Sequence, residues 1–225
     1  GHDTLILNGS GIAAFTGSSI EELKWDGSNG EALVNATSIT NLTTLTFSGD
    51  ATKTPVIRGL ETLSNDITIN ATYAAASPDT YSITAATATT VNLKADATSI
   101  SNATQADNDF TIYSNNAAAI TVNVEQYASS AGTLRLQKAS SFDATIDATA
   151  DFGNEVKLSA ATTVNVSGAG AISATISGEK ATTVNIDVAS GSFNFGGSAI
   201  QTMTLTSDDG LTMLGSSNVT GVVNL

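Results

Sequence analysis

Apolar and polar residues alternate in short segments along most of the chain, beginning near Thr43. The segments recur about every ten residues, and most carry two apolar residues two positions apart. A period of two is the signature of a β-strand with one buried and one polar face. Thr, Val and Ile favour strands, while Gly, Asn, Asp and Ser fill the intervals as turn residues. The pattern therefore predicts an all-β protein built from many short strands.

One six-residue word returns after 20 residues: ATTVNV at Ala161–Val166 and ATTVNI at Ala181–Ile186. Self-similarity at a fixed spacing is typical of solenoids. We therefore predict a parallel β-helix, or β-solenoid, with coils of about 20 residues and two strands per coil. On neighbouring coils, Asn165 and Asn185 would form a ladder of side-chain amides. Antiparallel β-sandwich domains are the alternative, because closely spaced short strands also occur there.

The repeat does not keep a constant phase along the chain. Asn123 and Asn165 carry the same word 42 residues apart, which is near two coils, whereas Asn92 and Asn123 are 31 residues apart. We therefore expect Asn123 to lie two coils from Asn165. Between Asn92 and Asn123 we expect either a slip of half a period or an insertion.

The first 40 residues have a different pattern. Ser18 precedes Glu21 by three positions, as in a capping box, and predicts one short helix over 18–25. We divide the chain into an N-terminal cap or linker region, residues 1–40, and a repetitive solenoid segment, residues 41–225. The last residues read as a strand that is cut off, so we expect a fragment of a longer protein.

Composition indicates a thin core. The chain of 225 residues holds 34 Thr, 33 Ala, 26 Ser and 18 Asn, whereas Leu, Ile, Val and Phe together number 52. The fraction of Leu, Ile, Val and Phe in the chain is therefore just above the roughly 20% below which chains tend to be disordered. A narrow solenoid can form its core from such a sequence, because each coil needs only a few large side chains.

Charge excludes several functional classes. Lys and Arg number 8 against 21 Asp and Glu, giving a formal net charge of −13. This argues against nucleic acid as a partner, and no apolar run is long enough for membrane insertion. The absence of Cys excludes disulfides, and a single His, His2, excludes a histidine metal cluster and leaves nucleophilic triads without a base. The cations are scattered along the sequence. We predict that the protein is not an enzyme and has no catalytic residue.

Calcium is the ion that the acidic residues favour. Asp outnumbers Glu 14 to 7, and Ca²⁺ prefers Asp, Asn and backbone carbonyl oxygens in turns. None of the clusters completes an EF-hand, and Asp and Asn are also ordinary turn residues. The candidate metal ligands lie in three clusters: Asp26, Asn29 and Glu31; Asp107 and Asp109; Asp208 and Asp209.

The repeated ATTVNV words, in an acidic chain rich in Ala, Thr, Ser and Asn, resemble bacterial surface-layer (S-layer) proteins of the type I-secreted RTX kind. Gly1–Leu5 is similar to the end of the calcium-binding nonapeptide G-G-x-G-x-D-x-U-x of that family. The resemblance implies an extracellular structural protein of the bacterial cell surface that assembles with itself into a lattice, with Ca²⁺ aiding folding or lattice contacts.

Two other functions remain open. An adhesin or carbohydrate-binding stalk would take a surface glycan as its partner, but the four Tyr residues are spread along the sequence. A polysaccharide-degrading β-helix enzyme is the less favoured alternative, because bases are scarce.

Overall fold

The computed structural model describes residues 1–7, 11–16, 19–25, 32–49, 56–60, 67–73, 79–85, 88–95, 106–114, 119–125, 128–136, 138–197, 199–216 and 221–225. Within them, 21 strands form one continuous hydrogen-bonded system. Every strand pairing recorded for it is parallel. The prediction of a parallel β-solenoid is therefore confirmed, and the antiparallel sandwich is wrong for these residues. No helix in the described part of the chain could span a membrane.

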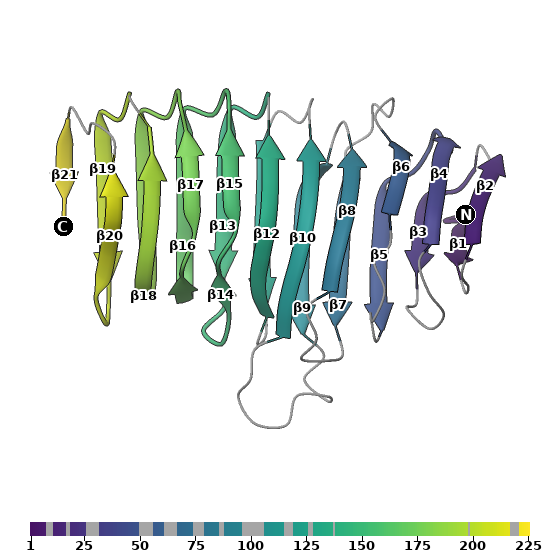
Figure 1. Cartoon of the computed structure of the whole chain (residues 1–225), viewed down its shortest axis with the longest axis horizontal. Helices are drawn as coiled ribbons and strands as arrows, with labels where there is room; N and C mark the ends of the chain where they lie inside the picture. Colours follow the sequence, from purple (N-terminus) through teal and green to yellow (C-terminus); the bar gives the residue numbers. More distant parts are fainter. Residues whose placement is uncertain are drawn as a thin grey trace.

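The chain alternates between two facing layers whose strands run in opposite directions (Figure 1). We call them sheet 1 and sheet 2. Sheet 1 contains β1 (Thr4–Leu7), β3 (Glu22–Trp25), β5 (Thr44–Gly49), β7 (Ile67–Tyr73), β9 (Ala88–Ala95), β11 (Ala119–Glu125), β13 (Ser141–Ile146), β19 (Thr202–Ser207) and β21 (Val222–Asn224). Sheet 2 contains β2 (Gly11–Thr16), β4 (Ala32–Ser38), β6 (Val56–Leu60), β8 (Asp79–Ala85), β10 (Ala106–Ser114), β12 (Ala128–Leu136), β14 (Asp151–Phe152), β15 (Glu155–Leu158), β17 (Thr175–Gly178) and β20 (Leu211–Ser216). The long strands β16 (Thr163–Ile172) and β18 (Thr183–Gly196) bend from sheet 1 into sheet 2.

Coil length varies along the stack. Asn165 pairs with Asn185, 20 residues on, as the sequence predicted. Asn92 pairs directly with Asn123, so the 31-residue step is one long coil with an insertion and not a half-period slip. Asn123, however, pairs with Thr145. The residue that lies two coils before Asn165 is Thr121, because Asn165 pairs with Asp143 and Asp143 pairs with Thr121. The predicted two-coil relation between Asn123 and Asn165 is therefore wrong by two positions.

The core lies between the sheets and consists of columns of stacked side chains. Phe142, Val164, Val184 and Met203 occupy one register position on four successive coils, and all are fully buried. Phe152 approaches from sheet 2, with its ring centroid 6.2 Å from that of Phe142. Burial of each such side chain stabilises the fold by about 1.5–3 kcal/mol before entropy costs. Few large residues per coil are needed, in keeping with the composition.

The repeated word places each of its residues in a distinct structural role. Ala161 is buried at the corner where sheet 2 turns into sheet 1. Thr162 donates from its backbone N and its Oγ1 to the carbonyl oxygen of Ser140 on the preceding coil, at 2.9 Å and 3.4 Å. Val164 and Val166 point into the core, whereas Asn165 lies on the outer face. The word recurs because every coil needs the same corner and the same alternation.

The predicted N-terminal helix is wrong where the structure describes it. Residues 22–25 form β3, and residues 19–21 are turn and coil. Ser18 lies outside the described residues. Leu23 is buried, and it stands in register between Leu5 and Leu45 of the neighbouring coils. A capping pattern describes local preference only, and the strands on both sides impose an extended conformation. The β3–β5 pairing joins residues on the two sides of residue 40, and the division into a cap or linker region and a solenoid segment stays a prediction.

Candidate functional surfaces

A ladder of polar side chains links three coils on the outer face of sheet 1. Asn185 Nδ2 donates to Asn165 Oδ1 at 2.8 Å, and Asn165 Nδ2 donates to Asp143 Oδ1 at 2.7 Å. All three side chains are half-buried. The ladder ends on a carboxylate, which strengthens the last bond because its acceptor is charged. The predicted Asn165–Asn185 ladder is confirmed, and Asp143 extends it by one coil.

The predicted calcium ligands occupy different parts of the stack. Asp26, Asn29 and Glu31 lie outside the described residues. Asp107 and Asp109 stand within β10, opposite Ser129 and Ala131 of β12. Their position in a strand differs from the turn that the sequence suggested.

The third predicted cluster follows β19. Asp208 and Asp209 are exposed in the bend before β20, where the Asp209 N–H donates to the carbonyl oxygen of Ala189 at 2.8 Å. Among the described residues, no group of three or more His, Asp or Glu side chains is placed to hold a metal ion. Because Ca²⁺ takes six to eight oxygen ligands, carbonyl oxygens and water would have to complete a site at these two carboxylates.

Glu22 joins the first coils of sheet 1. Its Oε1 accepts a hydrogen bond from Thr46 Oγ1 at 2.7 Å, and its Oε2 accepts one from Thr4 Oγ1 at 3.0 Å. His2 Nε2 lies 3.6 Å from the same Oε2. The Thr46 hydroxyl in particular, together with Thr4 and His2, lowers the pKa of the Glu22 carboxyl despite its partial burial. Like the asparagine ladder, this cluster links side chains of successive coils.

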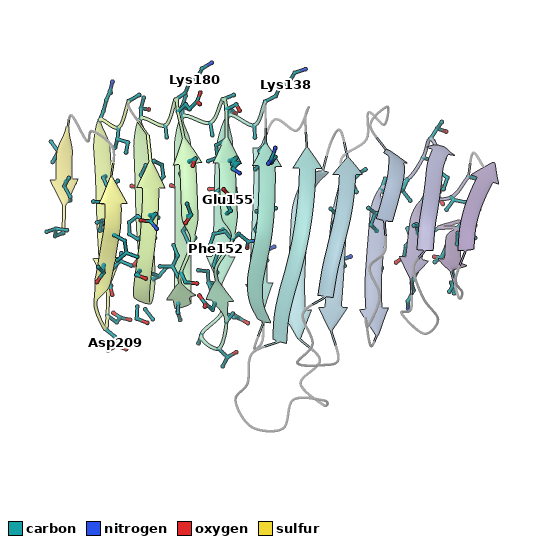
Figure 2. The ribbon with its side chains drawn as sticks, in the orientation of Figure 1. Lys138, Phe152, Glu155, Lys180 and Asp209 are labelled. Carbon is teal, nitrogen blue, oxygen red and sulfur yellow. The ribbon has the colours of Figure 1, made fainter. Side chains whose placement is uncertain are left out.

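Half of the chain's cations gather at one end of sheet 2. Arg135 of β12 pairs in register with Lys157 of β15, while Lys138 and Lys180 occupy the turns that follow β12 and β17 (Figure 2). We call these four residues the basic corner. These four cations, which are scattered along the sequence, therefore lie together in the folded structure. The signal in the sequence was the 22-residue interval between Arg135 and Lys157, which matches a coil.

Carboxylates and a cavity accompany the basic corner. Lys157 Nζ lies 2.8 Å from Glu155 Oε1. A cavity of about 310 Å³ opens beside it. Its lining consists of Lys157, Leu158, Ser159, Ser177 and Glu179. Positive charge at the corner is therefore partly balanced by carboxylates.

Large apolar side chains that are exposed among the described residues belong to β1 and β20 and to the segment from β21 to Leu225. Figure 1 shows these strands at the two ends of the stack. Ile6 of β1 is 54% exposed, and Leu214 of β20 is 63% exposed. Three more are Val222, Val223 and Leu225. Exposed apolar side chains of this kind can contact another surface.

Comparison with protein-family models, with curated proteins and with solved structures found no match.

Proposed function

We propose that the chain is a structural segment of an exported bacterial cell-surface layer protein that assembles with copies of itself into a lattice outside the cell, with Ca²⁺ stabilising the assembly. The observation that carries the proposal is the continuous parallel stack, in which outer polar side chains bond one coil to the next. The ladder of Asp143, Asn165 and Asn185 is its clearest part. Such bonds stiffen an extended body.

A stack of this kind suits a load-bearing role. In a solenoid each coil contacts only its neighbours, so stability is a sum of coil and interface contributions along one axis. The coil-to-coil hydrogen bonds of Thr162 and Thr182 repeat at the corner of successive coils. Repeated bonding along one axis supports a rigid spacer or tile.

The exposed apolar residues support association. Leu214 of β20 and Val222 of β21 are 63% and 62% exposed. Exposed apolar side chains of this kind favour contact with another surface. The acidic composition, with its Asp-rich turns, supports a role for Ca²⁺ between carboxylates that would otherwise repel one another.

Assembly can be tested by sedimentation velocity over a range of protein concentrations, with Ca²⁺ or with a chelator, followed by electron microscopy of the heaviest fractions. We expect ordered, concentration-dependent assemblies that are favoured by Ca²⁺. Leu214→Asp should weaken them, whereas Thr212→Asp, an exposed polar position on the same strand, is the matched control.

Two outcomes would overturn the proposal. One is a monomer at every concentration under both conditions. The other is release of oligosaccharides from polysaccharide incubated with the protein, which would favour the enzyme alternative.

A further inference from the structure

The turns of the solenoid form two opposite edges. Turns from sheet 2 into sheet 1 follow one edge, and turns from sheet 1 into sheet 2 follow the other, because each strand spans the height of the coil. Figure 2 shows Lys138 and Lys180 at the upper edge and Asp209 at the lower edge. We use the names upper edge and lower edge for these two rows of turns.

The upper edge carries the basic corner. Its four cations, Arg135, Lys138, Lys157 and Lys180, are accompanied by two carboxylates, Glu155 and Glu179. The corner therefore has a formal charge of +2. Because the whole chain carries −13, the rest of the chain carries −15. Both Lys138 and Lys180 are exposed in their turns. The basic corner therefore differs in sign from the remainder of the chain.

The lower edge has the opposite sign. The turns described there, 147–150, 168–170, 188–190 and 207–210, contain three exposed aspartates and neither Lys nor Arg. The aspartates are Asp147, Asp208 and Asp209. Carboxylates thus line the edge that lies farthest from the basic corner.

The two edges have compatible spacings. Lys138 precedes β13 and Lys180 precedes β18, two coils later, which places them about 10 Å apart at the spacing of paired strands. The two carboxylates of the proposed partner edge, Asp208 and Asp209, are adjacent residues of one bend, about 3.8 Å apart at their Cα atoms. A lysine side chain can cover the difference, because it has four rotatable carbons.

We propose that the upper edge of one copy docks, through Lys138 and Lys180, on the lower edge of a second copy, through Asp208 and Asp209. This inference rests on the proposed function, self-assembly, and names a contact that produces it. The contact joins two different surfaces, so it is heterologous and extends into an open sideways array instead of closing as a dimer.

A second copy fits the basic corner better than an anionic glycan does. The complementary surface is present on the same molecule, on the opposite edge. Glu179 adjoins Lys180 in the same exposed turn, so the corner does not present an unbroken run of positive charge to a long polyanion. Charge complementarity of this kind steers association and fixes the orientation of partners.

A charge-swap experiment tests the contact. The upper variant carries Lys138→Glu and Lys180→Glu, and the lower variant carries Asp208→Lys and Asp209→Lys. Both are studied with wild type by sedimentation velocity in chelator, which removes bridging by Ca²⁺, at low salt and in 1 M NaCl. Thermal melts confirm that the variants fold, as expected for exposed side chains. Lys24→Glu and Asp3→Lys control for a change of charge elsewhere.

Each swapped variant should associate about tenfold more weakly than wild type, because two exposed pairs of modest strength are lost together. A 1:1 mixture of the two variants should restore association, and so should a chain carrying all four substitutions. High salt should weaken the association of the wild type, since the Debye length falls to about 3 Å at 1 M ionic strength.

The outcomes separate this contact from self-assembly in general. Association of wild type that is unchanged by either swap or by salt would overturn the edge contact and leave the proposed function standing. Failure of the mixture to recover would overturn it as well. Wild type that stays monomeric in chelator at low salt would overturn the edge contact, and a monomer in Ca²⁺ as well would contradict the proposed function too. Assembly that requires added anionic polysaccharide would assign the basic corner to a glycan.

Discussion

Asn185 donates an amide hydrogen bond to Asn165 across 2.8 Å, one coil away on the same outer column. Asn165 repeats the bond toward Asp143 at 2.7 Å, so each amide acts as donor to the preceding coil. A parallel stack in register makes this repetition possible, because identical positions recur at the spacing of paired strands. A residue that repeats in the sequence at the length of one coil can therefore form the same hydrogen bond on each successive coil.

Asn165→Ala should lower the free energy of unfolding by about 1–3 kcal/mol, because it removes two side-chain hydrogen bonds and leaves half-buried partners on both sides. Chemical denaturation measures the change. Ser167→Ala is the matched control, since Ser167 is exposed two positions along the same strand. A cost for Asn165→Ala no larger than that of the control would contradict a stabilising ladder.

The sequence predicted the fold and this ladder because the 20-residue interval between Asn165 and Asn185 equals one coil. It did not predict the register to Asn123, because coils differ in length. Burial sets the register instead: Phe142 and Val164 share one inner column, and this places Asp143 beside Asn165. A recurring polar word is compatible with several registers, whereas a large buried side chain fits only one.

The candidate surfaces were harder to foresee than the fold. Arg135 and Lys157 become neighbours only when the coil between them has 22 residues, a length that the average period does not specify. The helix predicted over residues 18–25 was wrong for a related reason, since local capping signals carry no information about β1 and β5, the strands that flank β3. Placement on a surface depends on long-range register, which the local pattern does not contain.

Gly168→Ala should destabilise the protein more than Gly210→Ala does. Both glycines have positive φ, +133° and +98°, so either substitution strains the backbone by roughly 1–3 kcal/mol. A Cβ at Gly168 would also clash with the backbone carbonyl oxygen of Ile146, whereas nothing lies within 4 Å of one at Gly210. Overpacking adds about 1–3 kcal/mol to the destabilisation caused by Gly168→Ala. Equal denaturation midpoints for the two variants would contradict the close approach of β16 to β13.

Glu22→Gln should have a larger effect on stability at pH 7 than at about pH 3. The folded pKa of Glu22 is lowered from 4.5, first by the Thr46 hydroxyl. A carboxyl with a lowered folded pKa contributes stability that is fully present above its unfolded pKa and is lost as pH falls through the folded value. Thermal midpoints of wild type and variant at the two pH values measure the difference.

Two further variants identify the source of this pH dependence. Thr46→Val removes the main donor, so it should reduce the pH-dependent part of the Glu22→Gln effect. Glu179→Gln, an exposed glutamate in an upper turn, is the control for a change of net charge. A Glu22→Gln effect of the same size at both pH values would show that the ionised carboxylate contributes nothing to the links among β1, β3 and β5.

Calcium should raise the thermal midpoint of the chain. If one site binds with a dissociation constant near 1 mM, as in extracellular modules, about 10 mM CaCl₂ would stabilise the fold by roughly 1.4 kcal/mol. For a chain of this size that corresponds to about 3–5 °C. Asp208→Asn with Asp209→Asn should abolish the shift if that bend holds the ion, and Asp26→Asn with Glu31→Gln tests the N-terminal cluster in the same way. NaCl at matched ionic strength separates binding from screening of a chain with a net charge of −13. Identical midpoints in Ca²⁺, NaCl and chelator would contradict calcium stabilisation, and the lattice contacts would then have to form without the ion.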